Sequence, residues 1–316
     1  MLDSNAMNGT AAVIGAGLIG RAWAMVFARA GWHVRLHDSD AAQLAAARRL
    51  IAASLAEQEA AGLVVGAAQA IERIDTCPAI ENALAGCDWV QENLPEQVEI
   101  KRTVFARLDK QAPANAVLAS STSAIPASQF TQDLERRARC LVAHPVNPPH
   151  LVPVVELCGA PWTSAATLAR AREVMTAVGQ VPVTVRREVD GFVLNRLQGA
   201  LLTEAMRLVA EGYISPEDLD KTIAHGLGRR WSFMGPFATI ELNAPGGVPD
   251  YCARYSGFYR RLAADPPSPD VWTGEAAARV AAALGPAPSR DEQERRTRVR
   301  DRRLLALARH QREQLD

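Results

Sequence analysis

The glycine pattern G-x-G-x-x-G at Gly15, Gly17 and Gly20 constrains the fold more than any other feature of the chain. The apolar run 11–14 before it predicts a buried strand, and residues 18–30 after it predict a helix. In this setting the first glycine permits a tight turn, the second lets a phosphate group approach the backbone, and the third lets the helix pack on the strand. Because the helix start offers free amides to an anion, the motif predicts a dinucleotide-binding fold.

Asp38 indicates which dinucleotide is bound. It ends the next predicted strand, residues 32–37, at the spacing of an acid that holds the adenosine ribose. A carboxylate there repels a 2′-phosphate, and the following Ser39 and Asp40 supply no arginine to compensate. We therefore predict NAD as the cofactor, in preference to NADP. The predicted binding residues in this part of the chain are Gly15, Gly17, Leu18, Ile19, Gly20 and Asp38.

The pattern of the chain changes near residue 188. Before it, apolar runs alternate with helical stretches, which predicts a parallel sheet with helices on its faces. After it, helical patterns dominate, including a helix that begins at Ser215 and ends at Gly226, and a charge-dense helix at 289–316. The predicted fold is α/β, with a Rossmann-type domain at residues 7–187 and an all-α domain at 188–316. Further strands are expected at 89–90, 117–119, 140–142, 154–157 and 181–185.

Charge and composition exclude several classes of partner. The 35 basic and 35 acidic residues balance, whereas a general nucleic-acid or anionic-membrane binder needs a basic excess. No apolar run approaches the ~20 residues that span a bilayer. The five cysteines include no C-x-x-C spacing, which gives no sign of a zinc site or a disulfide framework. We expect no nucleic acid, membrane or metal partner, and a cytoplasmic location.

His144 and Glu156 form a candidate acid–base pair. His144 follows a predicted strand and lies in a loop stiffened by Pro145, Pro148 and Pro149. Glu156 comes twelve residues later within an apolar strand, where an unpaired carboxylate is costly to bury. Pairing with Glu156 would fix the tautomer of His144 and stabilise its protonated form, as a general base requires. Residue type alone leaves open a core histidine bonded to backbone and a glutamate bonded to an arginine.

Several segments together resemble the 3-hydroxyacyl-CoA dehydrogenase family, and the resemblance covers nearly the whole chain. The spacings agree as well, with 21 residues from Ser123 to His144 and twelve from His144 to Glu156. The segments are the glycine motif, the serine and threonine run 120–123, the pair His144 and Glu156, and the run Gly-Phe-Val-Leu-Asn-Arg at 191–196.

The resemblance implies roles for particular residues. His144 would remove the proton of a 3-hydroxyl group, and Glu156 would orient His144. Ser123 and Asn195 would bind the reacting oxygen. Glu96 and Lys101 would lie along the nicotinamide ribose and the substrate path. The resemblance also implies a helical domain like the C-terminal domain of 6-phosphogluconate dehydrogenase, and a homodimer.

The second half of the chain resembles one branch of the family, that of lambda-crystallin and L-gulonate 3-dehydrogenase. The resemblance lies at residues 226–236, 242–244 and 251–256. It implies that Arg230 points inward, where its guanidinium would grip the carboxylate of a small hydroxy acid. Surface ion pairs of Arg229 and Arg230 are the alternative.

The expected substrate is L-gulonate, oxidised to 3-dehydro-L-gulonate. A 3-hydroxyacyl-CoA such as 3-hydroxybutyryl-CoA is one alternative. L-carnitine is another, because Trp231 and Phe233 could hold its quaternary ammonium by cation–π contacts. Two non-enzymatic roles are further alternatives. A crystallin-like NAD(H)-binding structural protein would not require the four predicted catalytic residues, and an NAD-sensing DNA-binding regulator would require a basic recognition helix.

Overall fold

The computed structural model describes residues 8–314, which form two compact units. The first contains residues 8–196 and 296–314, and the second contains residues 197–295. Met7, the predicted start of the first domain, lies outside the described residues. No helix within 8–314 is long and apolar enough to cross a membrane.

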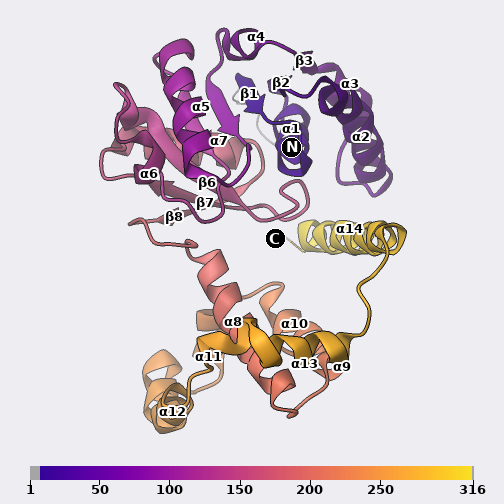
Figure 1. Ribbon diagram of the computed structural model, residues 1–316, viewed down its shortest axis with the longest axis vertical. Coiled ribbons are helices and arrows are strands. Elements are labelled where there is room, and N and C mark those ends of the chain that lie inside the picture. Colours follow the sequence, from indigo (N-terminus) through magenta and orange to yellow (C-terminus); the bar gives the residue numbers. More distant parts are fainter. Residues whose placement is uncertain (1–7, 315–316) are drawn as a thin grey trace. The chain divides into compact units, whose positions relative to one another are not determined.

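The first unit is built on one eight-stranded sheet with the order β3-β2-β1-β4-β5-β6-β7-β8 (Figure 1). Neighbouring strands from β3 to β6 run parallel, β7 runs antiparallel to β6, and β8 runs parallel to β7. The parallel sheet that the sequence predicted therefore carries two reversed strands at one edge. The strands are β1 (Thr10–Ile14), β2 (His33–His37), β3 (Ile74–Cys77), β4 (Trp89–Glu92), β5 (Val117–Ser120), β6 (Cys140–Pro145), β7 (Val154–Gly159) and β8 (Val181–Val185).

The sequence predicted seven of these strands and missed β3. Its two central residues, Asp75 and Thr76, are exposed, so the segment has no apolar run to reveal it. The strand order reverses between β1 and β4, since β2 and β3 lie on one side of β1 and the later strands on the other. Nucleotides bind in such folds at the carboxyl ends of the strands beside this reversal.

Helices cover both faces of the sheet, because alternate residues of each strand point to opposite sides. One face packs against α1 (Leu18–Arg29), α2 (Ala41–Ala60), α3 (Ala67–Glu72) and α7 (Ala165–Ala177). The other packs against α4 (Ile80–Leu84), α5 (Val98–Gln111) and α6 (Ser128–Thr131). A short 3-10 helix, η1, spans Arg137–Arg139.

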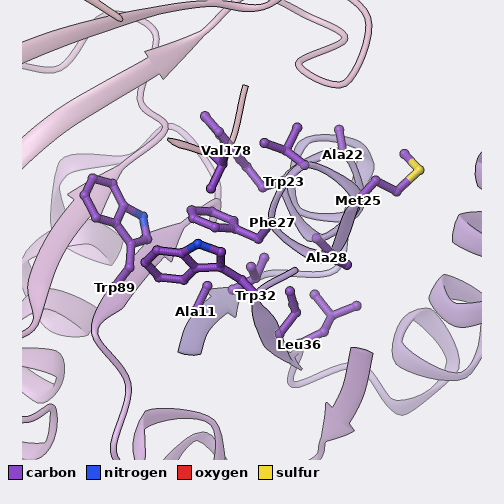
Figure 2. Packing of buried hydrophobic residues seen from close by; sticks show 14 of the residues in the cluster. Ala11, Ala22, Trp23, Met25, Phe27, Ala28, Trp32, Leu36, Trp89 and Val178 are labelled. Carbon is purple, nitrogen blue, oxygen red and sulfur yellow. The ribbon is translucent and has the colours of Figure 1, made fainter. Parts of the chain in front are cut away.

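Aromatic side chains form the centre of the first face (Figure 2). The ring of Phe27 lies 5.9 Å from Trp23, 5.4 Å from Trp32 and 6.3 Å from Trp89, measured between centroids. All four side chains are fully buried. This cluster fixes α1, and therefore the glycine loop that precedes it, against β1 and β4.

The second unit is entirely helical. Its α9 begins as predicted, with the Ser215 hydroxyl accepting the amide of Asp218 at 3.1 Å and Pro216 at the first helical position. The elements are α8 (Leu194–Ala210), α9 (Pro216–Thr222), the π-helix η2 (Ile223–Leu227), α10 (Gly228–Trp231), α11 (Pro236–Leu242), α12 (Gly247–Ala263), the 3-10 helix η3 (Pro269–Trp272), α13 (Gly274–Leu284) and α14 (Arg290–Glu313). Helices α8 and α14 each continue into the first unit.

The predicted helix end at Gly226 is wrong. The chain passes through the π-helical turn η2 and continues into α10. A Cβ at Gly228 would lie 2.9 Å from the carbonyl oxygen of Ile223, so glycine is the residue that lets the widened turn close. Gly226 and Gly228 thus both lie within a continuing helical segment, and Gly228 is the one that the turn requires.

The two units differ from the predicted division after Arg187. Residues 188–196 group with the sheet because the amides of Val193 and Leu194 donate to Glu156, which lies on β7. The end of α14 groups with the sheet as well, where Arg312 donates to the carbonyl oxygen of Leu63. Contacts between distant segments, which the sequence pattern does not display, produce this grouping.

Candidate active site

The glycine loop after β1 has the shape of a phosphate cradle. Gly15 has a φ of +98°, and a Cβ there would lie 2.9 Å from the carbonyl oxygen of Asn93. A Cβ at Gly17 would meet no described atom within 4 Å. Because Gly17 precedes α1 and has no side chain, it does not cap the amides of Leu18 and Ile19 at the start of the helix. The open space and the free amides fit the pyrophosphate of NAD.

The third glycine locks the loop to the helix. A Cβ at Gly20 would lie 1.8 Å from the carbonyl oxygen of Gly15, so no other residue fits there. Asp38 follows β2 and contacts the same loop, since one carboxylate oxygen accepts the amide of Ala16 at 2.7 Å and the other accepts the amide of Asp40 at 2.8 Å. The predicted ribose-binding acid therefore lies beside the predicted phosphate cradle.

Lys101 is buried in an ion pair with Glu92 that the sequence did not predict. Its side chain is 1% exposed, and its ammonium lies 3.1 and 3.0 Å from the two carboxylate oxygens of Glu92. Glu96, predicted beside it, is 3.8 Å away. The available signal was Glu92, two residues after the predicted strand 89–90, because a carboxylate requires a partner when it is buried. The ammonium of Lys101 is thus bonded to Glu92 and lies farther from Glu96. Its contact with the cofactor remains a prediction.

Glu96 organises the loop that carries Ser123. One of its carboxylate oxygens accepts the amides of Ser123 and Ala124, each at 3.1 Å, and also the hydroxyl of Thr122. The loop follows β5, and β5 pairs with β6, which ends at the candidate base. The loop and the base therefore lie at the same edge of the sheet.

His144 and Glu156 form the predicted pair. They are directly opposite each other on the antiparallel strands β6 and β7, and the Nδ1 of His144 lies 2.8 Å from one oxygen of Glu156. Both are buried, at 5% and 1% exposure. A carboxylate only accepts, so Nδ1 carries the proton and Nε2 keeps its lone pair. In the structure the partner of the imidazole Nδ1 is therefore the Glu156 carboxylate and not a backbone group. The partners of Glu156 are His144 and two backbone amides, and not an arginine.

The second oxygen of Glu156 accepts two backbone amides. These belong to Val193 at 2.9 Å and Leu194 at 3.0 Å. Burial acts to raise the pKa of Glu156, but the hydrogen bonds from His144, Leu194 and Val193 outweigh it and leave the pKa below its ordinary value. Glu156 is therefore an anion at neutral pH, which is the form that supports a protonated histidine.

Ser123 and Asn195 are brought together as predicted. The Nδ2 of Asn195 donates to the carbonyl oxygen of Ser123 at 2.8 Å. The Ser123 hydroxyl has no hydrogen-bond partner in the part of the chain that the structure describes, so it is available to a ligand. Their contact with a reacting oxygen remains a prediction. Within residues 8–314, no group of three or more His, Cys, Asp or Glu side chains could hold a metal ion.

Arg230 lies on α10 in the second unit and is exposed. Within residues 8–314, neither Arg229 nor Arg230 forms an ion pair, and the predicted grip of Arg230 on a substrate carboxylate remains a prediction. Trp231 and Phe233 beside them are 42% and 72% exposed. A free guanidinium flanked by aromatic side chains suits a small organic anion.

A cavity of about 710 Å³ lies in the same unit. Helix α12 contributes most of its lining, and the hydroxyls of Tyr251 and Tyr259 lie 2.8 Å apart within it. This hydrogen bond raises the pKa of Tyr251, and the nearby charge of Arg230 opposes that rise. The positive charge of Arg230 therefore acts on Tyr251, which lines the cavity. The lining residues are Asn243, Tyr251, Tyr255, Phe258 and Tyr259.

Comparison with known proteins relates both units to dehydrogenases. The family model for the NAD-binding domain of 3-hydroxyacyl-CoA dehydrogenase matches residues 10–189, and the model for its C-terminal domain matches residues 191–268. The chain is 44% identical over 280 residues to the lambda-crystallin homolog of Bos taurus, a match that covers 87% of each chain. It is 39% identical over 231 residues to the L-carnitine dehydrogenase of Streptomyces griseus, covering 73% of this chain and 68% of that protein.

A solved structure shares the architecture of the chain. It is that of 5-formyl-3-hydroxy-2-methylpyridine 4-carboxylic acid 5-dehydrogenase, described as an NAD⁺-dependent dismutase. The TM-score is 0.83 at 29% identity, and the match covers 96% of this chain and 98% of that chain.

Proposed function

Because the chain belongs to the 3-hydroxyacyl-CoA dehydrogenase family, and is thus an NAD-dependent oxidoreductase acting on a CH–OH group, we propose that it oxidises the 3-hydroxyl of a small free hydroxy acid. Arg230 carries the proposal, since its guanidinium is exposed and unpaired among the described residues and its charge acts on Tyr251 in the lining of the cavity. A single carboxylate needs one such fork, whereas the phosphorylated head of an acyl-CoA needs several cationic contacts. L-gulonate is the first candidate, in keeping with the resemblance of residues 226–236, 242–244 and 251–256 to that branch of the family.

The proposed base is the Nε2 atom of His144. Because Nδ1–H is bonded to Glu156, Nε2 is the atom that takes the proton of the substrate hydroxyl. The buried Glu156 anion then opposes the positive charge that His144 acquires. The glycine loop after β1 and Asp38 would hold NAD, whose nicotinamide would supply the hydride acceptor for the carbon that carries the hydroxyl.

Ser123 and Asn195 support the reacting oxygen in this proposal. The free hydroxyl of Ser123 donates to the oxygen as it becomes a carbonyl. Asn195, through its bond to the Ser123 carbonyl oxygen, fixes where that hydroxyl can point. Glu96 holds the same loop from the other side through the Ser123 amide. Asp38 holds the adenosine ribose and excludes a 2′-phosphate.

L-carnitine is the second candidate substrate. The exposed rings of Trp231 and Phe233 favour it, because aromatic faces attract a quaternary ammonium. The identity of 39% to an L-carnitine dehydrogenase supports it further. The carboxylate of carnitine would use Arg230 in the same way, so the two acids differ only in what the aromatic side chains contact.

We further propose that the protein is a cytoplasmic homodimer. The second unit exposes large apolar side chains on several helices, among them Leu197, Phe237, Leu242 and Leu262, and water would be excluded from them in an interface. The four buried cysteines, Cys77, Cys87, Cys140 and Cys158, are free thiols, which fits a reducing compartment.

Arg230→Met tests the substrate proposal. The loss of a hydrogen-bonded charge should weaken binding of the hydroxy acid by about 1.5–3 kcal/mol. This should appear as a higher KM for the hydroxy acid, with the KM for NAD unchanged. Arg229→Met is the matched control, since it removes the same charge one residue away, and it should leave both constants near the wild-type values. Efficient oxidation of 3-hydroxybutyryl-CoA that neither substitution alters would contradict the proposal.

A further inference from the structure

The turn before α8 has a backbone that is unusual for its sequence. Gly191 and Phe192 both have positive φ angles, +74° and +50°. Glycine adopts this region freely, but phenylalanine does so at a cost, because its Cβ approaches the neighbouring carbonyl oxygen. Phe192 is the only non-glycine residue within 8–314 with a positive φ. A strained residue persists where surrounding structure requires it.

The backbone of this turn aims two amides at the catalytic pair. The amide of Phe192 donates to the carbonyl oxygen of Val189 at 3.0 Å, which closes the turn. The next two amides, of Val193 and Leu194, then converge on one oxygen of Glu156. Consecutive amides that follow a left-handed residue form a concave anion site. The strained φ of Phe192 thus lets the start of α8 hold the Glu156 carboxylate.

The side chain of Phe192 contacts the other member of the pair. It is fully buried, and its ring centroid lies 5.6 Å from that of His144, with an angle of 36° between the ring planes. A glycine would adopt the turn without strain but would leave this space beside the imidazole empty. The presence of phenylalanine at a position that favours glycine is explained by the packing against His144.

We propose that Phe192 is a positioning residue whose backbone holds Glu156 through two amides and whose ring holds the imidazole of His144. It touches neither substrate nor cofactor in this role. The inference rests on the proposed role of His144 as the base, but not on which hydroxy acid is oxidised.

Three substitutions separate the two contributions. Phe192→Gly keeps the left-handed turn and removes the ring, Phe192→Val keeps apolar bulk and resists the turn, and Phe192→Leu keeps most of the volume. Each should lower kcat by about tenfold to a hundredfold, the scale of a misplaced catalytic group, with the KM for NAD near its wild-type value. Only Phe192→Val should also move the acidic limb of the kcat profile to higher pH, because Glu156 loses its amide donors.

Phe105→Leu is the matched control for Phe192→Leu. Phe105 is an equally buried phenylalanine on α5 in the same unit, so its substitution should lower Tm while leaving kcat and the pH profile unchanged. If Phe192→Gly or Phe192→Val does not fold, the Phe192→Leu and Phe105→Leu comparison still decides the matter.

A second measurement does not depend on turnover. The Nδ1 proton of His144, bonded to a buried carboxylate, should give a downfield proton NMR resonance that disappears in His144→Ala. We expect it to shift or broaden in Phe192→Gly and Phe192→Leu, and to stay unchanged in Phe105→Leu. An unchanged resonance together with wild-type kcat in both Phe192 variants would overturn the inference. A wild-type protein that oxidises no free hydroxy acid would contradict the substrate proposal only, since 3-hydroxybutyryl-CoA can then serve in the comparison.

Discussion

Two histidines flank the start and the end of the connection after β6, His144 on β6 itself and His150 six residues later, and they differ in their surroundings. His144 is bonded through Nδ1 to the Glu156 carboxylate. His150 is partly buried, its Nδ1 has no partner within the described residues, and the nearest charges are the guanidiniums of Arg29 and Arg300. A histidine beside an anion can accept a proton and be stabilised, whereas one beside cations cannot. Both histidines are removed from solvent, but the partner of His144 is an anion and the charged neighbours of His150 are cations, and this difference distinguishes the candidate base from the other histidine.

His144→Ala gives the largest expected effect on this comparison. Removal of the base should lower kcat by about a hundredfold or more, which is the usual contribution of general base catalysis. Binding of NAD, followed by fluorescence titration, should remain intact because the glycine loop is unaffected. A variant with near-normal kcat would show that the two histidines do not differ in the way proposed.

His150→Gln should act on stability instead of turnover. Burial first, and then the charges of Arg29 and Arg300, lower the pKa of His150 to about 4 from its ordinary 6.5. Between these values the unfolded chain binds a proton that the folded chain does not, so the stability of the wild-type protein falls as pH decreases from 6.5 to 4. The full loss is about 3 kcal/mol, and the variant should lack it.

The measurement is Tm as a function of pH. The decrease in Tm on acidification should be smaller in His150→Gln than in wild type, and His33→Gln, which changes an exposed histidine on β2, serves as the control. Equal pH dependence in wild type and His150→Gln would refute this description of the loop, as would a large loss of kcat in His150→Gln at neutral pH.

Glu156→Gln removes the negative charge that distinguishes the surroundings of His144 from those of His150. It therefore tests the contribution of that charge alone. The amide side chain keeps the size of Glu156 but not its charge, so protonated His144 is less stabilised. We expect kcat to fall by about tenfold, less than in His144→Ala, because the base itself remains. Steady-state kinetics at neutral pH measure this change in kcat. An unchanged kcat would mean that the Glu156 carboxylate only stabilises the pairing of β6 and β7.

Much of the nucleotide-binding half could be predicted because its signals are local. The apolar run 11–14, the three glycines and Asp38 each act through neighbours in the sequence, and β1, α1 and β2 formed where they were expected. The pairing of His144 with Glu156 was also accessible, since a carboxylate inside an apolar strand demands a partner.

Other features depend on contacts between distant residues. The ion pair of Glu92 with Lys101 forms only when β4 and α5 pack, and no spacing rule revealed it. Strand β3 was missed because Asp75 and Thr76 are exposed, and the reversal of β7 relative to β6 has no signature in the residues themselves. The left-handed conformation of Phe192 could not be predicted either, since sequence rules assign that region to glycine.

The most direct test of the central claim is the formation of NADH by the wild-type protein with matched substrates. L-gulonate, L-carnitine and 3-hydroxybutyryl-CoA would be compared by kcat/KM under one set of conditions with NAD. The proposed function predicts that a free acid, L-gulonate first, is preferred over the acyl-CoA by about tenfold or more, which corresponds to about 1.4 kcal/mol of differential transition-state binding. A higher kcat/KM for 3-hydroxybutyryl-CoA than for either free acid would contradict it.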